Sequence, residues 1–165
     1  MAQITLGGTP TQTSGELPAV GSSLPSYQLT KHDMSPLHLD ELKGRRIVLN
    51  IFPSVDTAVC ASSVRTFNQK ASNLENTTVV CISKDLPFAL ARFCGAEGID
   101  NVEVTTDFRI PEFAQNNGLL IMDGAFGGLN ARAIIVLDEE MKVTYTELVP
   151  EVGQEPNYEA AIAAL

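Results

Sequence analysis

Short apolar runs alternate along the chain with stretches in which apolar residues recur at helical spacing. The runs at 46–52 and 77–83 are rich in β-branched residues and have the length of buried parallel strands. Between them, apolar residues recur at intervals of three and four, at Val64, Phe67, Ala71 and Leu74. That interval predicts a helix with one apolar face, ending near 73–76. The segment is therefore predicted to form a strand, a helix and a second buried strand.

The remaining pattern predicts a hairpin, several shorter strands and three further helices. Residues 3–13 predict a small hairpin that turns at Gly7-Gly8. Strands are predicted at 27–30, 102–106, 131–137 and 142–149, and helices at 85–93, 111–117 and 156–165. This order of elements matches a thioredoxin-like fold, so we expect one α/β domain over residues 1–165 with the hairpin as an N-terminal extension.

The helix predicted at 85–93 determines what is expected of Cys94. Pro87 fits the first turn of this helix, and Gly95 fits the position just after its C-terminus. Cys94 is therefore expected at a frayed, accessible helix end. Cys81 lies in the middle of the strand at 77–83, which favours a small core residue.

Composition and charge narrow the class of protein. With 165 residues and 44% hydrophobic content, the chain is long enough for one compact core. Its net charge of −9 argues against nucleic acid as a partner, because phosphate binding needs a basic surface. No apolar run approaches the ~20 residues of a membrane span, and the first residues lack the regions of a signal peptide. These features predict a cytoplasmic protein.

Cysteine and histidine usage argues against a disulfide framework and against a metal site. The three cysteines, Cys60, Cys81 and Cys94, are few and odd in number. None of them forms a C-x-x-C pair, and the only histidines, His32 and His38, lie upstream in a polar connection. We therefore expect neither a metal nor a cofactor, and we expect both histidines at the surface.

Cys60 is the candidate nucleophile, because it lies in the first turn of the helix that follows the first buried strand. Asp56 and Thr57 are the candidate N-cap residues of that helix. Free N–H groups and the macrodipole at a helix start favour an anion, and so favour a thiolate over a thiol. Cys60 also precedes Val64 by four residues, so its sulfur is expected to point inward.

Arg132 is the second candidate, because it opens an otherwise apolar strand. An unpaired guanidinium is costly in such surroundings, so an anion is expected nearby. The pattern alone leaves open whether that anion is a carboxylate or a reactive group. It likewise leaves Thr57 and Pro53 open, since a helix cap and a loop stop account for them equally well.

The residues around Cys60 resemble a known family. Pro53-x-x-x-Thr57-x-x-Cys60 is similar to the active-site signature of peroxiredoxins, and the longer segment 50–68 resembles the bacterial thiol peroxidases in particular. The resemblance continues through 85–89, 92–98, 131–133 and 155–161, and so covers nearly the whole chain.

This resemblance implies a reaction and the residues that perform it. Cys60 would attack hydrogen peroxide or an organic hydroperoxide, with Thr57, Arg132 and Pro53 shaping the site. Cys94 would then resolve the oxidised Cys60 in an intramolecular disulfide, and thioredoxin would regenerate both thiols. The family also implies a homodimer and a preference for alkyl or lipid hydroperoxides.

Three other functions fit parts of the pattern. A cysteine hydrolase normally needs a histidine base, yet both histidines precede Cys60 in unpromising sequence. A thioredoxin-like disulfide reductase is disfavoured by Thr57, which stands where its first cysteine should be. A non-catalytic adaptor with a thioredoxin-like fold predicts an ordinary, unreactive Cys60.

Overall fold

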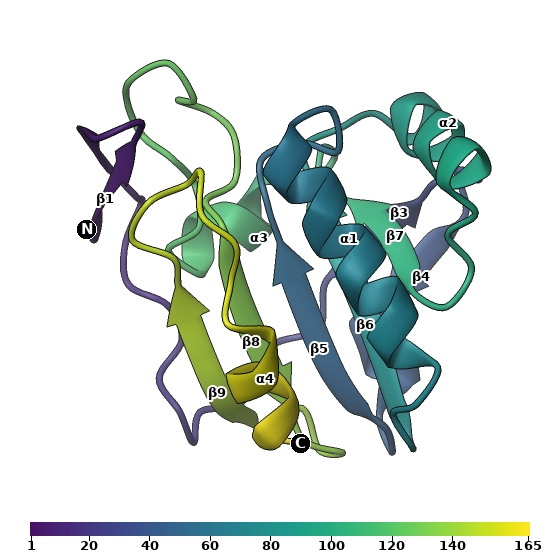
Figure 1. Ribbon diagram of the computed structural model, residues 1–165. Helices are drawn as coiled ribbons and strands as arrows, with labels where there is room; N and C mark the ends of the chain where they lie inside the picture. The colour runs from purple at the N-terminus through teal and green to yellow at the C-terminus, as the bar shows by residue number, and fades with distance from the viewer.

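A computed structural model describes residues 1–165 as a seven-stranded sheet with helices packed on it and a separate two-stranded hairpin (Figure 1). The strands are β1 (Gln3–Leu6), β2 (Thr9–Gln12), β3 (Gln28–Lys31), β4 (Pro36–His38), β5 (Arg46–Ile51), β6 (Thr77–Ser83), β7 (Glu103–Thr106), β8 (Ala133–Leu137) and β9 (Val143–Leu148). The helices are α1 (Ala58–Ala71), α2 (Pro87–Glu97), α3 (Pro111–Asn116) and α4 (Tyr158–Ala163), with a single 3-10 turn η1 (Leu39–Leu42). None of these helices has the length and apolar character needed to cross a membrane.

The sheet has the order β4-β3-β7-β6-β5-β8-β9. Its centre is parallel, because β5 pairs with β6 and β6 pairs with β7 in the same direction, while β8 runs antiparallel to β5. Helix α1 connects β5 to β6, and α2 connects β6 to β7 (Figure 1). The carboxyl ends of β5 and β6 therefore lie at the same edge of the sheet, where ligand sites of parallel sheets commonly form.

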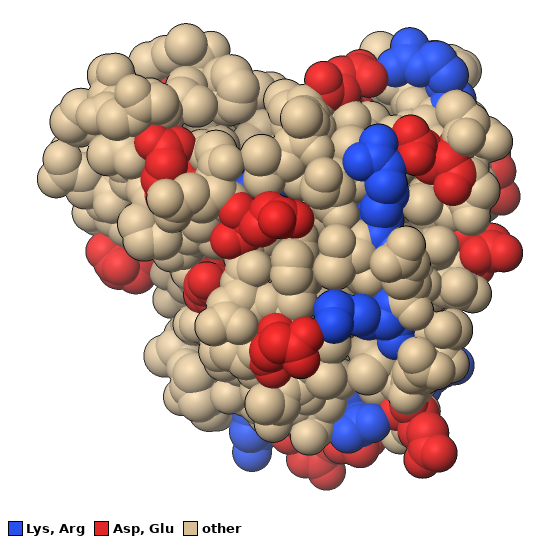
Figure 2. All heavy atoms as spheres, viewed as in Figure 1, with Lys and Arg blue, Asp and Glu red and all other residues tan.

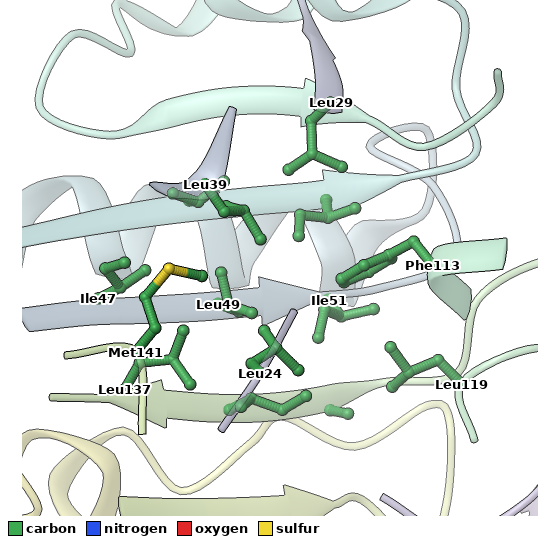
Figure 3. Close-up of a cluster of buried hydrophobic side chains, with 14 of the residues drawn as sticks. Leu24, Leu29, Leu39, Ile47, Leu49, Ile51, Phe113, Leu119, Leu137 and Met141 are labelled. Carbon is green, nitrogen blue, oxygen red and sulfur yellow. The ribbon is translucent and has the colours of Figure 1, made fainter. Parts of the chain in front are cut away.

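Alternate residues of β5 divide the core into two layers. Ile47, Leu49 and Ile51 belong to one apolar cluster, which Figure 3 shows together with Phe113 and leucines from the flanking segments. Val48, on the other face, packs in a second cluster with the apolar face of α1. This alternation is what a strand requires, since successive side chains point to opposite faces. Both faces are covered, which explains the continuous apolar run in the sequence.

The predicted N-terminal hairpin is confirmed. β1 and β2 pair antiparallel, and the two-residue turn between them consists of Gly7 (φ 58°) and Gly8 (φ 83°). Two positive φ values are what such a turn needs, and glycine adopts them without steric cost.

The predicted end of the second helix is wrong. Helix α2 continues through Gly95 and ends at Gly98, which takes the left-handed conformation (φ 64°) typical of a helix C-terminus. Cys94 therefore lies inside α2, and only 8% of its surface is exposed. It packs in the second apolar cluster instead of lying at an accessible, frayed end.

Candidate active site

The loop after β5 places Cys60 in the first turn of α1. Thr57 is the N-cap residue, with extended backbone (φ −101°, ψ 146°), and the helix begins at Ala58. The Thr57 hydroxyl makes no capping hydrogen bond to the helix, contrary to the expectation, and it donates to the carbonyl oxygen of Ser54 at 3.1 Å. The backbone N–H groups of Ala58, Val59 and Cys60 have no acceptor within the protein. Three donors are thus left free in the same first turn of α1 that contains Cys60.

Arg132 lies against Cys60. Its Nη2 donates to the Cys60 Sγ at 3.2 Å, and its Nε donates to the carbonyl oxygen of Val152 at 2.8 Å. The side chain is only 2% exposed, and its Nη1 is buried without any hydrogen-bond partner. Of the two partners that the sequence left open for Arg132, a carboxylate or a reactive group, the structure shows the Cys60 sulfur.

Sheet register brings these two residues together across 72 positions of the chain. Ala133, the first residue of β8, pairs with Ile51, the last residue of β5. Arg132 directly precedes that pair, and the loop to Cys60 directly follows it. Pro53 is buried in this loop, two residues after the end of β5.

A small cavity opens next to the arginine. Its volume is about 150 Å³, and it is lined by Leu6, Thr57, Ala58, Val59, Phe126, Arg132, Val152 and Gly153. Cys60 itself has no exposed surface and does not line this cavity, so a ligand in the cavity does not reach the sulfur without a local shift of the structure. Leu6 comes from the hairpin and Phe126 from the loop before β8, and no pattern in the sequence indicated that either residue belongs to the site.

A second, larger cavity separates α1 from α2. It has a volume of about 460 Å³, and two ion pairs cross it. Arg65 binds Glu97 through Nε (2.8 Å) and Nη2 (3.1 Å), and Arg92 binds Asp56 at 2.8 Å. Figure 2 shows basic and acidic side chains next to one another over these two helices.

The other two cysteines are buried, and none of the three forms a disulfide. Cys94, in α2, shares an apolar cluster with Cys60. Burial raises the pKa of the Cys94 thiol. Cys81, in the centre of β6, has no exposed surface, and burial raises its pKa to about 12. In this conformation both are neutral thiols at pH 7 and poor nucleophiles.

Comparison with known proteins decides the family. The sequence matches the redoxin family over residues 19–162. It is 56% identical to the thiol peroxidases of Mycobacterium tuberculosis and Mycobacterium bovis over 165 residues, which covers 100% of this chain and 99% of each relative. The chain belongs to the bacterial thiol peroxidase family of peroxiredoxins. The thiol peroxidase of Corynebacterium glutamicum is 53% identical over the same length.

Solved structures agree with this assignment. A peroxiredoxin-like protein from Aquifex aeolicus superimposes with a TM-score of 0.93 at 36% identity, covering 99% of this chain and 95% of that one. The thiol peroxidase of Chromobacterium violaceum has a TM-score of 0.88, covering 96% of this chain and 91% of its own, and at 22% identity it supports the fold alone. The predicted thioredoxin-like fold is confirmed, and the protein is a peroxiredoxin with thiol-dependent peroxidase activity.

Proposed function

We propose that the protein reduces hydrogen peroxide and organic hydroperoxides with Cys60 as the peroxidatic nucleophile. Cys94 then resolves the oxidised Cys60 in an intramolecular disulfide, and thioredoxin reduces that disulfide. The observation that carries the proposal is the Arg132 Nη2 to Cys60 Sγ distance of 3.2 Å at the free N–H groups of a helix start.

In the first step, the Cys60 thiolate attacks one peroxide oxygen. A sulfur–oxygen bond forms, the O–O bond breaks, and the departing oxygen takes up a proton and leaves as water or an alcohol. Full ionisation of an ordinary thiol contributes only about 2 kcal/mol at pH 7, whereas enzymes lower barriers by about 8 kcal/mol or more. Most of the rate must therefore come from donors that bind the charge developing on the oxygens.

Arg132 supplies such a donor. Its Nη1 is buried without a partner, which costs roughly 1–3 kcal/mol in the resting protein. A peroxide oxygen beside the sulfur would satisfy this N–H group and offset that cost. The donor is thus already oriented before substrate binds, which is the property that makes electrostatic stabilisation effective.

Thr57 and Pro53 receive different roles in this proposal. The Thr57 hydroxyl hydrogen is committed to Ser54, and Thr57 lines the cavity, so its hydroxyl oxygen acts as an acceptor and orients the peroxide O–H group. Pro53 has no N–H group and is buried, so it adds bulk around the site without a competing donor.

Resolution requires both cysteine segments to rearrange. Cys60 and Cys94 lie in separate helices, and a disulfide needs Cα atoms about 4.4–6.8 Å apart with suitable side-chain directions. Local unwinding of α1 and α2 would expose both sulfurs and also remove the burial that raises the pKa of Cys94. Cys81 is the poorer resolver, because β6 is hydrogen-bonded on both sides, to β5 and to β7.

The apolar wall of the small cavity supports organic hydroperoxides as substrates. Leu6, Val59, Phe126 and Val152 form this wall, where an alkyl chain would leave water. A homodimer in the cytoplasm is also proposed from the family resemblance. Phe88, 71% exposed at the start of α2, is apolar surface that a second copy would cover.

The test is peroxide consumption with thioredoxin and its reductase. Cys60→Ser is expected to abolish turnover, and Cys81→Ser, which removes an equally buried sulfur, is the matched control and keeps it. Turnover that survives in Cys60→Ser refutes the proposal. Ester hydrolysis lost in His38→Ala would instead support the hydrolase alternative.

A further inference from the structure

Asp85 joins the segment that carries Cys60 to the segment that carries Cys94. It lies between the end of β6 and the start of α2, and its carboxylate accepts three hydrogen bonds. Oδ2 accepts from the Ser83 hydroxyl at 2.7 Å and from the backbone N–H of Val55 at 2.9 Å. Oδ1 accepts from the Ser54 hydroxyl at 2.6 Å. Two of these three donors belong to the loop between β5 and α1.

The hydrogen bonds continue from Ser54 to the active site. The Ser54 carbonyl oxygen accepts from both the hydroxyl and the backbone N–H of Thr57, each at 3.1 Å. The Ser54 hydroxyl oxygen also accepts from the backbone N–H of Asp56 at 3.1 Å. One carboxylate thus fixes the turn that positions Thr57 and the first turn of α1.

No basic side chain forms an ion pair with the Asp85 carboxylate. The nearby basic side chains have other partners, since Lys84 binds Asp107 at 2.9 Å and Arg92 binds Asp56. Asp85 forms no ion pair. Its negative charge is satisfied by two hydroxyls and one backbone N–H group, which are the contacts of a residue that orders a loop.

We propose that Asp85 is a positioning residue that holds the Cys60 loop against the base of the Cys94 helix, and that it accelerates the reaction with peroxide while slowing disulfide formation. The inference rests on the proposed function. The peroxide step needs Thr57 and the start of α1 in the arrangement seen here. The disulfide step needs the two segments to leave it, so a contact that stabilises this arrangement acts on the two steps in opposite directions.

A slower peroxide step together with a faster disulfide step distinguishes this role of Asp85 from a general loss of stability. In Asp85→Ala, the three donors lose their acceptor, and the arrangement competent for peroxide becomes less populated. We expect the rate constant for Cys60 oxidation to fall about tenfold and that for disulfide formation to rise about tenfold. At high peroxide, less Cys60 reaches the sulfinic acid, because the sulfenic acid is consumed sooner.

Rapid-quench experiments on the full chain separate the two steps. Reduced protein is mixed with hydrogen peroxide, quenched with an alkylating reagent, and analysed by mass spectrometry for sulfenic acid and for the disulfide. Asp138→Ala is the matched control, because the Asp138 carboxylate also accepts loop N–H groups (from Glu140 and Lys142, each at 2.9 Å) but lies in the turn between β8 and β9. It is expected to leave both rates unchanged.

Ser54→Ala provides a second variant, which removes one of the three contacts to Asp85 together with the hydrogen bond from the Asp56 N–H group to the Ser54 hydroxyl oxygen. It is expected to shift the two rates in the same opposite directions as Asp85→Ala, but less. Two rates that fall together, or that do not change, in a folded variant overturn the inference. A wild-type protein that does not react with peroxide refutes the proposed function instead, so the two failures are distinguishable.

Discussion

Replacing Arg132 with methionine removes a buried guanidinium while keeping an unbranched apolar side chain in place of its stem. In the native protein this guanidinium contacts the Cys60 sulfur at 3.2 Å and the Val152 carbonyl oxygen at 2.8 Å, and its Nη1 has no partner. The substitution therefore separates two quantities, the stabilisation of the transition state and the stability of the fold.

The expected loss of rate is large. Removing one preorganised donor from a charge-stabilising site costs about 2.7–4 kcal/mol, or about 10²–10³-fold. Arg132 directs Nη2 at the sulfur and has Nη1 free for a peroxide oxygen, so the loss in Arg132→Met should reach at least the upper part of that range.

The expected loss of stability is small. The Val152 carbonyl loses its donor, which costs roughly 1–3 kcal/mol, but the unpartnered Nη1 and the buried charge disappear, which returns a similar amount. The free energy of unfolding in urea should change by less than about 1 kcal/mol.

Three measurements test the prediction: the second-order rate with hydrogen peroxide, the rate of iodoacetamide alkylation, and urea unfolding. Alkylation needs the thiolate but breaks no O–O bond, so Arg132→Met should slow it less than the peroxide reaction. Arg65→Met, which removes the ion pair between the 44% exposed Arg65 of α1 and Glu97 of α2, is the control and should change neither rate much. A peroxide rate within threefold of wild type, or equal losses in both reactions, would refute the assigned role.

Three further predictions concern the resolving cysteine, the apolar wall of the small cavity, and the pH dependence of folding stability. Cys94→Ser should react with one equivalent of peroxide and then stop in the presence of thioredoxin, while Cys81→Ser turns over; the reverse result would make Cys81 the resolver. Phe126→Ala should lower kcat/KM about tenfold for a bulky organic hydroperoxide and much less for hydrogen peroxide, because only the former contacts the apolar wall; equal losses would contradict this contact. Hydrogen bonds from two glycine N–H groups and from the Thr5 hydroxyl lower the pKa of Glu151 from 4.5 to about 2. The Glu151 carboxylate therefore stabilises the fold above pH 4.5, and this contribution is lost as the pH falls through about 2, so Glu151→Gln should lower the urea midpoint at pH 7 but not at pH 2. A difference that does not vary with pH would show that the charge is not responsible.

Strong local patterns predicted the centre of the fold. β5 and β6 are buried on both faces, and their continuous apolar runs therefore predicted buried parallel strands. The position of Cys60 follows from the same pattern, because a helix start must come where a buried strand ends and an apolar stripe begins. Helix termini were harder to predict from the sequence, since Gly95 and Gly98 are both suitable residues for a helix end. The structure shows that α2 ends at Gly98.

The contacts within the site could not be predicted in the same way. The approach of Arg132 to Cys60 depends on the register in which Ala133 faces Ile51, and the apolar pattern is equally compatible with a shift of two residues. The Thr57 hydroxyl could form a hydrogen bond to the helix or to the preceding turn. It donates to the Ser54 carbonyl oxygen, because the loop bends back on itself. Contacts between distant segments are a property of the assembled sheet.

The ion pairs between α1 and α2 must break during the proposed cycle, and they are weaker than the contacts that hold Arg132 in place. α1 and α2 are bridged by Arg65–Glu97 and Arg92–Asp56, whose side chains are between 32% and 66% exposed, and such pairs contribute about 0–1 kcal/mol each. Arg132, in contrast, is anchored beside β8, in the hydrogen-bonded interior of the sheet. In the proposed cycle, the two cysteines therefore leave this arrangement and return to it, while Arg132 stays in place.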